Sequence, residues 1–301
     1  EKSFYNTMES ENQLFFKNEL FIDDSSKVLV LDKSDGYTEN FGKQWQDFNK
    51  VQIDSLNSFD ISEKYLEELL FEEIDNLEGK KVLEVGCGAG RFTEHLVKKA
   101  KICVSVDMSS AIFHNVAKDM ENLVLVKADF TKLMPKMKFD FVICRGVLQH
   151  TPDPFLSILK LQEFVSNTGS VYFDIYSSKL GKLHPKYFLW RPLIKILWTY
   201  EGFQKFLRDN ITVLLKYKRL LKSFFFNSSF IADSLIPIWD YKDIIDLNDK
   251  QLEEWAILDT LDGIYAKYDS PKNYKKVIRL LKKNKIELLK SNKSKNYFKT
   301  R

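Results

Sequence analysis

The chain has 301 residues, of which 44% are hydrophobic and 29% are charged. These values are typical of a globular protein and exclude a disordered or fibrous chain. The three cysteines, Cys87, Cys103 and Cys144, lack metal-ligand spacing, so we expect no metal site and a reducing compartment. No apolar run is long enough to cross a membrane, and the first residues do not form a signal peptide. We therefore expect a cytoplasmic protein.

The net charge of +4 is unevenly distributed along the chain. Residues 177–230 contain 11 Lys and Arg against 2 Asp and Glu, and residues 271–301 contain 12 against 1. The rest of the chain therefore carries a net charge of −16. This arrangement, an acidic body with two basic segments, is more informative about partners than the total charge.

Four zones follow one another in chain order. Residues 1–60 are mixed and rich in aromatic side chains, and residues 61–176 alternate short β-rich runs with helical patterns. Residues 177–250 are helical, apolar and basic, whereas residues 251–301 return to a mixed pattern. We expect these zones to be an N-terminal segment, a ligand-binding core, a helical insertion and a closing part of the core.

The second zone contains five predicted strands separated by predicted helices. Such alternation indicates βαβ units and a parallel sheet with helices on both faces. A helix over 274–283 and strands over 286–290 and 297–300 close the sheet, the last strand being antiparallel. The predicted fold class is α/β, a doubly wound, seven-stranded, mostly parallel sheet. The five strands are expected at 81–85, 101–106, 123–126, 139–144 and 171–176, and the helices between them at 92–100, 109–120 and 155–165.

The first of these strands runs directly into a glycine-rich turn. Glu84 precedes three alternating glycines, Gly86, Gly88 and Gly90, and Asp107 ends the next strand. Glycines at such a turn let the backbone approach a ligand closely, and an acid at the next strand end can accept hydrogen bonds from ribose hydroxyls. The spacing matches neither the dinucleotide motif G-x-G-x-x-G nor a Walker A loop. The turn therefore indicates another nucleotide-like ligand.

Five motifs in register resemble those of the class I S-adenosylmethionine (SAM)-dependent methyltransferases. They lie at residues 82–96, 104–109, 126–130, 139–154 and 171–176. The resemblance implies SAM as cofactor and S-adenosylhomocysteine as product. It also implies that Glu84 orders the loop or binds the SAM amino group, that Asp107 holds the ribose and that Asp129 accepts from the adenine amine. The other residues implied to contact SAM are Gly86, Cys87, Gly88, Gly90, Met108, Phe130, Arg145 and Gly146.

The segment upstream of the core, at residues 37–45, resembles one that folds back over SAM in members acting on sugars and secondary metabolites. On this resemblance, Gln44 and Trp45 close the cofactor pocket. The alternative is an N-terminal helix that packs Phe41, Trp45 and Phe48 against the core, at spacings of 4 and 3. The residues before this segment contain no cysteine, so the zinc role of a cysteine-rich hairpin in some relatives is not expected.

His150 is the candidate general base, since an oxygen acceptor of high pKa needs one and histidine has a suitable pKa. It follows the fourth strand, where the acceptor would approach the methyl group. The alternative is a structural histidine that orders the loop, as is common in relatives. Its neighbour Gln149 is a candidate acceptor contact. The loop lacks the [DNS]-P-P-[YF] signature of enzymes that methylate base amino groups, so DNA is not an expected partner.

The insertion at residues 177–250 has helical apolar spacing with Lys and Arg on its other face. We expect a helical cap that shapes the acceptor pocket. Its charge has three open explanations, namely a solvated face, an anionic acceptor or a membrane surface. The third is suggested by Trp190, Trp198 and residues 224–226, which stand beside lysines.

Four more candidate acceptor contacts lie in the last zone, at Asp259, Asp262, Tyr265 and Tyr268. In sugar-modifying relatives a similar segment returns to the mouth of the active site, and loop packing is the alternative. We expect methyl transfer to the oxygen of a small polar or anionic acceptor, such as a sugar, a nucleotide-linked sugar or a secondary metabolite. The alternatives are a lipid or quinone-like acceptor at a membrane surface and a SAM-binding protein without catalysis. Membrane contact is not favoured, and the oligomeric state is left open.

Overall fold

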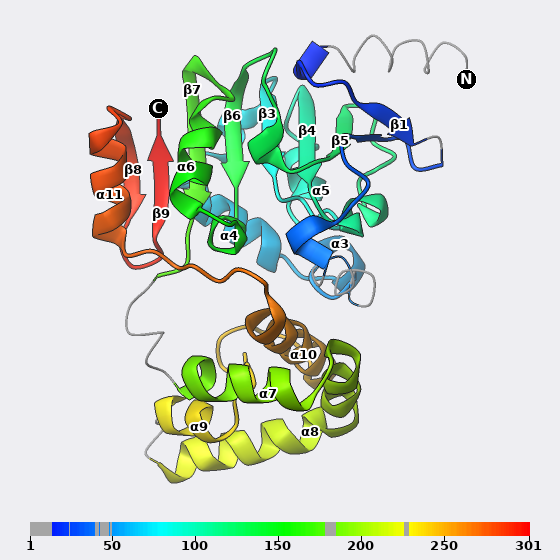
Figure 1. Ribbon diagram of the computed structural model, residues 1–301, viewed down its shortest axis with the longest axis vertical. Helices are drawn as coiled ribbons and strands as arrows, with labels where there is room; N and C mark the ends of the chain where they lie inside the picture. Colours follow the sequence, from blue (N-terminus) through cyan, green and yellow to red (C-terminus); the bar gives the residue numbers. More distant parts are fainter. Residues whose placement is uncertain are drawn as a thin grey trace.

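The computed structural model describes residues 14–23, 25–39, 42, 48, 50–177, 185–225 and 229–301. Within these ranges the chain forms two parts, a twisted sheet covered by helices and a smaller group of helices below it (Figure 1). No helix in the ranges is long and apolar enough to span a bilayer. The same ranges contain no group of three His, Cys, Asp or Glu side chains placed to hold a metal ion.

The sheet has nine strands in the order β1-β2-β5-β4-β3-β6-β7-β9-β8. The strands from β2 to β7 in this order are parallel, whereas β1 is antiparallel to β2 and β9 is antiparallel to both its neighbours. The mostly parallel, doubly wound α/β class is confirmed. The strands are β1 (Phe21–Asp23), β2 (Val28–Val30), β3 (Lys81–Val85), β4 (Ile102–Asp107), β5 (Leu123–Lys127), β6 (Phe139–Cys144), β7 (Val165–Asp174), β8 (Leu288–Asn292) and β9 (Tyr297–Thr300).

The count of nine strands corrects the expected seven. The additional strands, β1 and β2, come from the N-terminal zone, and β2 joins the sheet by pairing Leu29 with Val126 and Val30 with Lys127. All three residues of β2 are buried. A strand of three residues carries too little pattern to be predicted. It forms here because the edge strand β5 offers a row of backbone groups for pairing.

Short helices and 3-10 turns connect the strands. The helix expected over 109–120 is reduced to the 3-10 turn η3. The helix expected over 155–165 ends early, because Val165 already pairs with Phe139 of β6. The helical elements of this part are η1 (Gly36–Thr38), α3 (Asp54–Asn57), α4 (Ile61–Leu69), η2 (Ile74–Leu77), α5 (Thr93–Leu96), η3 (Ser110–His114), η4 (Phe130–Lys132), η5 (Leu148–His150), α6 (Pro154–Gln162) and α11 (Tyr274–Lys283).

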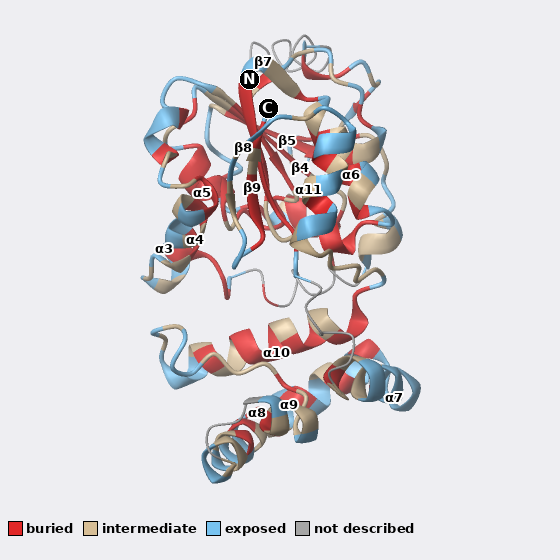
Figure 2. Ribbon diagram, turned by 90° about the vertical axis from the view of Figure 1, so that its left-hand side faces the viewer, coloured by how far each residue is buried: buried red, intermediate tan, exposed pale blue. Residues whose placement is uncertain are grey.

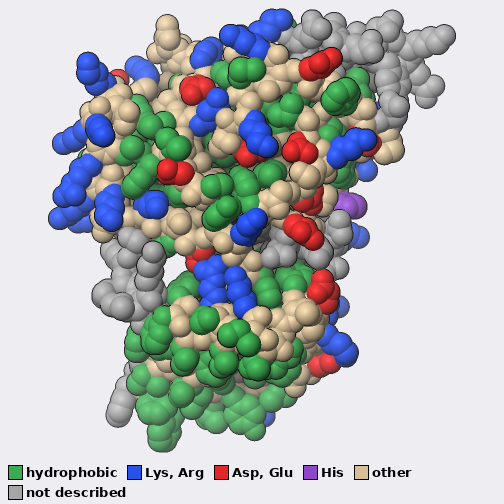
Figure 3. Space-filling view, viewed as in Figure 1, with side chains coloured by type: hydrophobic (Ala, Val, Ile, Leu, Met, Phe, Trp, Pro, Cys, Tyr) green, Lys and Arg blue, Asp and Glu red, His purple; other side chains and the backbone are tan. Residues whose placement is uncertain are grey.

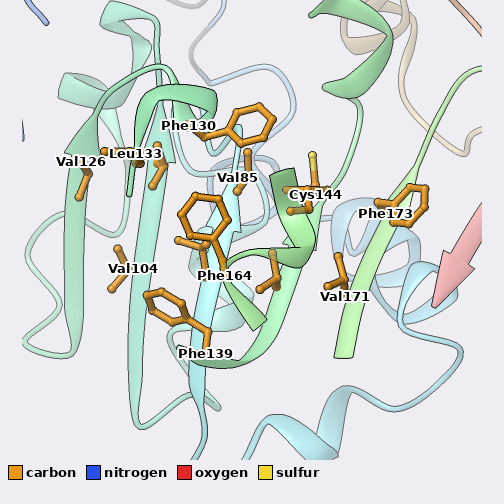
Figure 4. Packing of buried hydrophobic residues seen from close by; sticks show 14 of the residues in the cluster. Val85, Val104, Val126, Phe130, Leu133, Phe139, Cys144, Phe164, Val171 and Phe173 are labelled. Atoms are coloured by element: carbon orange, nitrogen blue, oxygen red, sulfur yellow. The ribbon is translucent and has the colours of Figure 1, made fainter. Parts of the chain in front are cut away.

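The hydrophobic core lies on both faces of the sheet. Side chains alternate along each strand, so that Val104 of β4 belongs to one cluster and Cys103 to the other. Helices α6 and α11 cover one face, and α4 and α5 cover the other (Figure 2). Figure 4 shows the first cluster, in which Phe139 and Phe164 pack beside Val104. Burial of both faces explains why the central strands are almost continuously apolar.

The second part, here called the helical unit, comprises residues 185–225 and 229–266. Its own core joins Phe203 and Leu207 of α8 to Trp255 and Leu261 of α10. Since α10 packs on α8, the boundary expected at residue 250 falls inside this unit, and we propose that the unit extends to residue 266. Its elements are η7 (Lys186–Trp190), α7 (Arg191–Leu197), α8 (Tyr200–Phe224), α9 (Ser229–Leu235) and α10 (Asp249–Tyr265).

Candidate active site

A cavity of about 320 Å³ lies between the sheet and the helical unit. One side comes from the turns after β3, β4, β5 and β6, at the carboxyl ends of parallel strands, where doubly wound sheets bind ligands. The opposite side comes largely from α10. The first side, the sheet wall, comprises residues 85–88, 106–109, 128–130 and 145–147. The second side, the helical wall, comprises Tyr241, Ile245, Trp255, Leu258, Asp259 and Asp262.

The glycine-rich turn after β3 forms the first part of the sheet wall. Gly86 and Gly88 line the cavity with φ angles of 82° and 51°, which L side chains rarely adopt. A Cβ at Gly86 would lie 2.0 Å from a methyl carbon of Val147, so no side chain fits there. Cys87 also lines the cavity, whereas Gly90 lies outside the lining. The turn thus presents backbone to the cavity rather than side chains.

Asp107 ends β4 beside this turn, as its spacing suggested. Its Oδ2 accepts a hydrogen bond from the Gly88 backbone N–H at 2.7 Å, and its Oδ1 accepts from the backbone N–H and the hydroxyl of Ser109, both at 2.7 Å. Burial raises the pKa of this carboxyl, and the hydrogen bonds oppose that rise. Both Asp107 and the following Met108 line the cavity. The carboxylate is therefore held in one orientation at the cavity wall.

Glu84 lies beneath the glycine turn and does not line the cavity. Its Oε2 accepts hydrogen bonds from the hydroxyls of Thr93 and Ser105, both at 2.7 Å, which ties β3 to α5 and β4. The side chain is only 3% exposed, and burial raises the pKa of the carboxyl to about 7. This position favours the loop-ordering alternative over contact with the SAM amino group.

Asp129 and Phe130 both line the cavity after β5. Asp129 also caps η4, because its Oδ1 accepts from the backbone N–H of Thr131 at 3.0 Å and from the Thr131 hydroxyl at 2.7 Å. Both hydrogen bonds go to the same oxygen. The capping role and a place in the cavity wall are therefore compatible.

Arg145 and Gly146 line the cavity after β6. The Gly146 N–H donates to Oδ1 of Asp174 at 2.6 Å, which ties the ends of β6 and β7. Arg145 Nη1 donates to the Tyr297 hydroxyl at 2.8 Å, and the guanidinium lies 5.0 Å from the ring centre of Tyr65. Burial raises the pKa of Asp174, whereas the charge of Arg145 opposes that rise. This corner is thus a buried, fully connected polar cluster.

A strap from the N-terminal zone crosses the cavity beside β5. Tyr37 and Thr38 line the cavity. Lys127 is only 1% exposed, and its ammonium donates to the backbone carbonyl of Met108 at 3.1 Å and pairs with Asp35 Oδ1 at 3.0 Å. The same ammonium also donates to the carbonyls of three consecutive residues of the strap, 32–34. One buried cation therefore fastens the strap to the sheet wall.

The two residues expected to close the cofactor pocket, Gln44 and Trp45, lie outside the described residues. Phe48, which belonged to the packing alternative, is buried in the core of the helical unit. The cavity contacts made by this zone are those of Tyr37 and Thr38, at the beginning of the segment on which the resemblance was based.

His150 lines the cavity where the sheet wall meets the helical wall. Its Nδ1 lies 3.0 Å from the backbone carbonyl of Tyr268, and because a carbonyl only accepts, Nδ1 carries the proton. In the neutral ring Nε2 is then the basic nitrogen, and it lies 4.0 Å from Asp262 Oδ2. Tyr176 packs edge-on against the imidazole, with ring centres 5.8 Å apart. The ring is therefore fixed in both tautomer and orientation.

The helical wall is one face of α10. Trp255, Leu258, Asp259 and Asp262 lie at helical spacing and all reach the cavity. Asp259 Oδ2 accepts a hydrogen bond from the hydroxyl of Tyr241, and burial raises the pKa of Asp259 to about 6. Burial also raises the pKa of Asp262. Asp259 and Asp262, which we expected on a loop returning to the active site, thus reach the cavity from a helix.

Three expected acceptor contacts do not line the cavity. Gln149 is fully buried, with its Oε1 accepting from the backbone N–H of Tyr176 at 3.4 Å. The hydroxyl of Tyr265 contacts the backbone carbonyls of Trp198 and Thr199 inside the helical unit. Tyr268 supports His150 through its carbonyl. These residues position others rather than facing the cavity.

Arg91 is the main cavity residue that the motifs did not indicate. Its Nη1 donates to Gln52 Oε1 at 2.7 Å, and its guanidinium lies between the rings of Phe92 and Trp255, at 5.2 and 5.3 Å from their centres. Burial and the charge of Arg145 lower its pKa. Because Arg91 directly follows the glycine-rich turn, its position in the sequence could have identified it as a cavity residue. Two other cavity residues, Asp174 and Tyr176, lie in the motif at 171–176, which assigned them no role. The remaining ones come from distant segments without local motifs, namely Gln52, Tyr65, Tyr241 and Ile245.

Known proteins match the region that builds the sheet wall. The family described as "Methyltransferase domain" matches residues 60–224. A protein of Pasteurella multocida named "Ubiquinone biosynthesis O-methyltransferase" is 28% identical over 47% of this chain and 63% of its own length. A protein of the same name from Pseudomonas syringae pv. tomato is 33% identical over 34% of this chain and 47% of its own. The matches thus span about half to two thirds of these relatives.

Among solved structures, PKMT2 from Rickettsia typhi in complex with AdoHcy superimposes with a TM-score of 0.48 at 16% identity. That match covers 74% of this chain and 43% of the other. The family match covers more than half of the chain and includes the whole glycine turn.

Proposed function

The chain belongs to the methyltransferase domain family, and we propose that it transfers a methyl group from S-adenosylmethionine to a hydroxyl oxygen of a small, flat acceptor. SAM is the cofactor implied by the family, and when bound it supplies an electrophilic methyl group on a sulfonium. The residues of the cavity have separate tasks in this proposal. The sheet wall binds the cofactor, and the helical wall together with His150 binds and deprotonates the acceptor.

The sheet wall has the features that a SAM site needs. A Cβ at Gly86 would overlap Val147, so the turn stays free of a side chain there and its backbone lines the cavity. In our proposal Asp107 accepts from the ribose hydroxyls, Asp129 accepts from the adenine amine, and Met108 and Phe130 pack against the adenine ring. All four side chains line the cavity, which supports their assignment.

His150 is proposed as the general base, and its setting is the observation that carries the assignment to oxygen. The Tyr268 carbonyl holds the proton on Nδ1, so Nε2 is the nitrogen that accepts the acceptor's hydroxyl proton. Asp262, at 4.0 Å from Nε2, stabilises the imidazolium that results. A positioned base of this kind accelerates proton transfer steps by about 10²–10⁴-fold.

The chemistry of the helical wall favours an aromatic acceptor. Trp255 and Tyr241 form the wall with the apolar Ile245 and Leu258, and Tyr176 faces the same cavity. Flat aromatic surfaces pack well against a flat ring. A phenolic hydroxyl, with a pKa of about 10, also loses its proton to imidazole more easily than an alcohol does. The names of the bacterial relatives support a quinol-like phenol as the substrate class.

A sugar or nucleotide-linked sugar is the second candidate, and Arg91 is the observation that favours it. Its guanidinium lies at the cavity beside Arg145, and arginine is well suited to bind phosphate. The acidic side chains of the helical wall, Asp259 and Asp262, count against a strongly anionic acceptor. A location in the cytoplasm stays a prediction for either candidate.

The decisive experiment measures S-adenosylhomocysteine formation with matched acceptors. The purified chain is incubated with SAM and with catechol, phenol or a nucleoside diphosphate sugar, while calorimetry records SAM affinity separately. We expect turnover with the catechol and little with the sugar. Turnover with the sugar alone would replace the first candidate by the second. SAM binding without turnover of any acceptor would support a SAM-binding protein that lacks catalysis.

A further inference from the structure

The surface of the helical unit is unusually apolar. Fourteen of the 23 exposed large hydrophobic side chains in the described ranges belong to this unit. Figure 3 shows that hydrophobic side chains are dense at the lower end of the molecule on the face in view. A contiguous exposed apolar surface marks an interaction site more often than chance exposure does. The side chains concerned are Phe188, Leu189, Leu193, Ile196, Leu197, Trp198, Phe206, Val213, Tyr217, Leu220, Phe224, Phe230, Leu235 and Ile244.

Helix α8 has two separate apolar faces. The buried face presents Phe203, Leu207, Ile211 and Leu215 to the core of the unit. The exposed face presents Phe206, Val213, Tyr217, Leu220 and Phe224, which recur at intervals of 7, 4, 3 and 4 residues. This spacing places the second set along one stripe of the helix. The first face accounts for packing within the unit, whereas the second serves no packing purpose there.

The exposed stripe continues from α8 onto α7. Trp198, between the two helices, lies against Phe206 with ring centres 5.6 Å apart. Its neighbours Ile196 and Leu197 are 81% and 58% exposed, and Phe224 at the other end of the stripe is 76% exposed. Aromatic and aliphatic side chains thus form a surface that extends along two helices.

Exposed cations border this surface. Residues 185–225 contain nine Lys and Arg against two acidic residues, Glu201 and Asp209. Four of the nine cations, Lys186, Arg191, Lys218 and Arg219, form ion pairs with Asp233, Asp240 or Asp269. Lys195 and Lys216 are exposed beside the apolar side chains. A shallow groove next to the stripe is lined by Lys195, Trp198 and Lys267, together with neighbouring apolar residues. The surface therefore combines many apolar side chains with a few exposed cations and a single carboxylate on the stripe, Asp209, which pairs with Lys205.

We propose that this face of α7 and α8 docks on the surface of an anionic lipid bilayer. Amphipathic helices rich in Lys and Arg bury their apolar side chains about 5–10 Å into the headgroup region, while the cations attract anionic lipids. Since no described helix can span a membrane, the contact is peripheral. A second copy fits less well, because a symmetric interface would bring the exposed Lys195 and Lys216 of both copies together. This inference goes beyond the proposed reaction and does not depend on it.

Vesicle flotation of the full chain tests the proposal. We expect the chain to float with vesicles of phosphatidylcholine and phosphatidylglycerol at low salt, and to remain behind with phosphatidylcholine alone or at high salt. The double variant Ile196→Glu/Phe224→Glu should bind about tenfold more weakly or worse, because it places carboxylates in the apolar stripe. Leu156→Glu is the matched control, since Leu156 is 64% exposed on the sheet part and should leave flotation unchanged.

Other outcomes would overturn the proposal. They are no flotation of the wild type with anionic vesicles, equal flotation on neutral vesicles, or unchanged flotation of the double variant. Dimers in sedimentation velocity that the double variant abolishes, without any vesicle binding, would assign the face to a second copy. SAM affinity measured by calorimetry reports folding of each variant. Turnover of a water-soluble acceptor is recorded separately, so a failed reaction and a failed docking surface are distinguished.

Discussion

The two walls of the cavity are built in different ways. The sheet wall uses short turns that follow parallel strands, and its acids are held by backbone N–H groups, as Asp107 is by Gly88 and Asp129 by Thr131. The helical wall uses side chains that hold one another, as Tyr241 holds Asp259. We therefore expect changes in the first wall to disturb the fold and the proposed cofactor site together. Changes in the second wall and at His150 should alter the reaction while leaving the fold in place.

The largest expected effect is the loss of turnover on substitution of His150, with SAM binding retained. His150→Gln removes the basic ring nitrogen and leaves a neutral polar side chain of similar size. We expect kcat to fall by about 10²–10⁴-fold with SAM affinity unchanged. Steady-state kinetics and calorimetry on the same preparation provide the two numbers. His114→Gln, at an exposed position of η3, is the control, and near-normal turnover by His150→Gln would reduce His150 to a loop-ordering residue.

Glu84 tests whether the sheet wall depends on a buried carboxyl beneath it. Its folded-state pKa of about 7 lies above the usual 4.5, so the folded chain binds the proton more tightly than the unfolded chain. The stability contributed by this proton is present below pH 4.5 and is lost as the pH rises to about 7. The loss amounts to about 3 kcal/mol.

Glu84→Gln removes that titration. We therefore expect the free energy of unfolding of this variant, relative to wild type, to rise by about 3 kcal/mol between pH 4.5 and pH 8. Urea unfolding across the range measures the difference. Glu121→Gln, an exposed substitution, should run parallel to wild type. A difference between Glu84→Gln and wild type that does not vary with pH would contradict burial as the cause.

Asp107 is expected to show the smallest of these effects. Asp107→Asn keeps the size of the side chain but removes the charge that favours two hydroxyl donors. SAM affinity should weaken by about 1–3 kcal/mol, or about 5- to 150-fold. Titration calorimetry measures it, with the exposed Asp119→Asn as control. An unchanged affinity for SAM would remove Asp107 from the proposed ribose site. It would also count against assigning the sheet wall to the cofactor and the helical wall to the acceptor.

The sequence could predict most of the sheet because its information is local. The strands β3 to β6, the glycine turn and Asp107 all lie within a few residues of a recognisable pattern. Strands β1 and β2 escaped prediction, because three residues acquire β structure only from the neighbour that pairs with them. Arg91 escaped for a different reason. Its motif position was visible, but its contacts with Gln52 and Trp255 join segments far apart in the chain.

The sequence by itself determined the fold class, the methyltransferase resemblance and most of the sheet wall, since alternating strands and a glycine turn leave few other arrangements. Tertiary structure alone decided which residues of the helical unit face the cavity. Asp259 and Asp262 reach the cavity while Tyr265 does not, because only one face of α10 points toward the sheet. It also decided which apolar face of α8 is buried. Both faces are apolar in the sequence, and only the packing of α10 against one of them leaves the other at the surface.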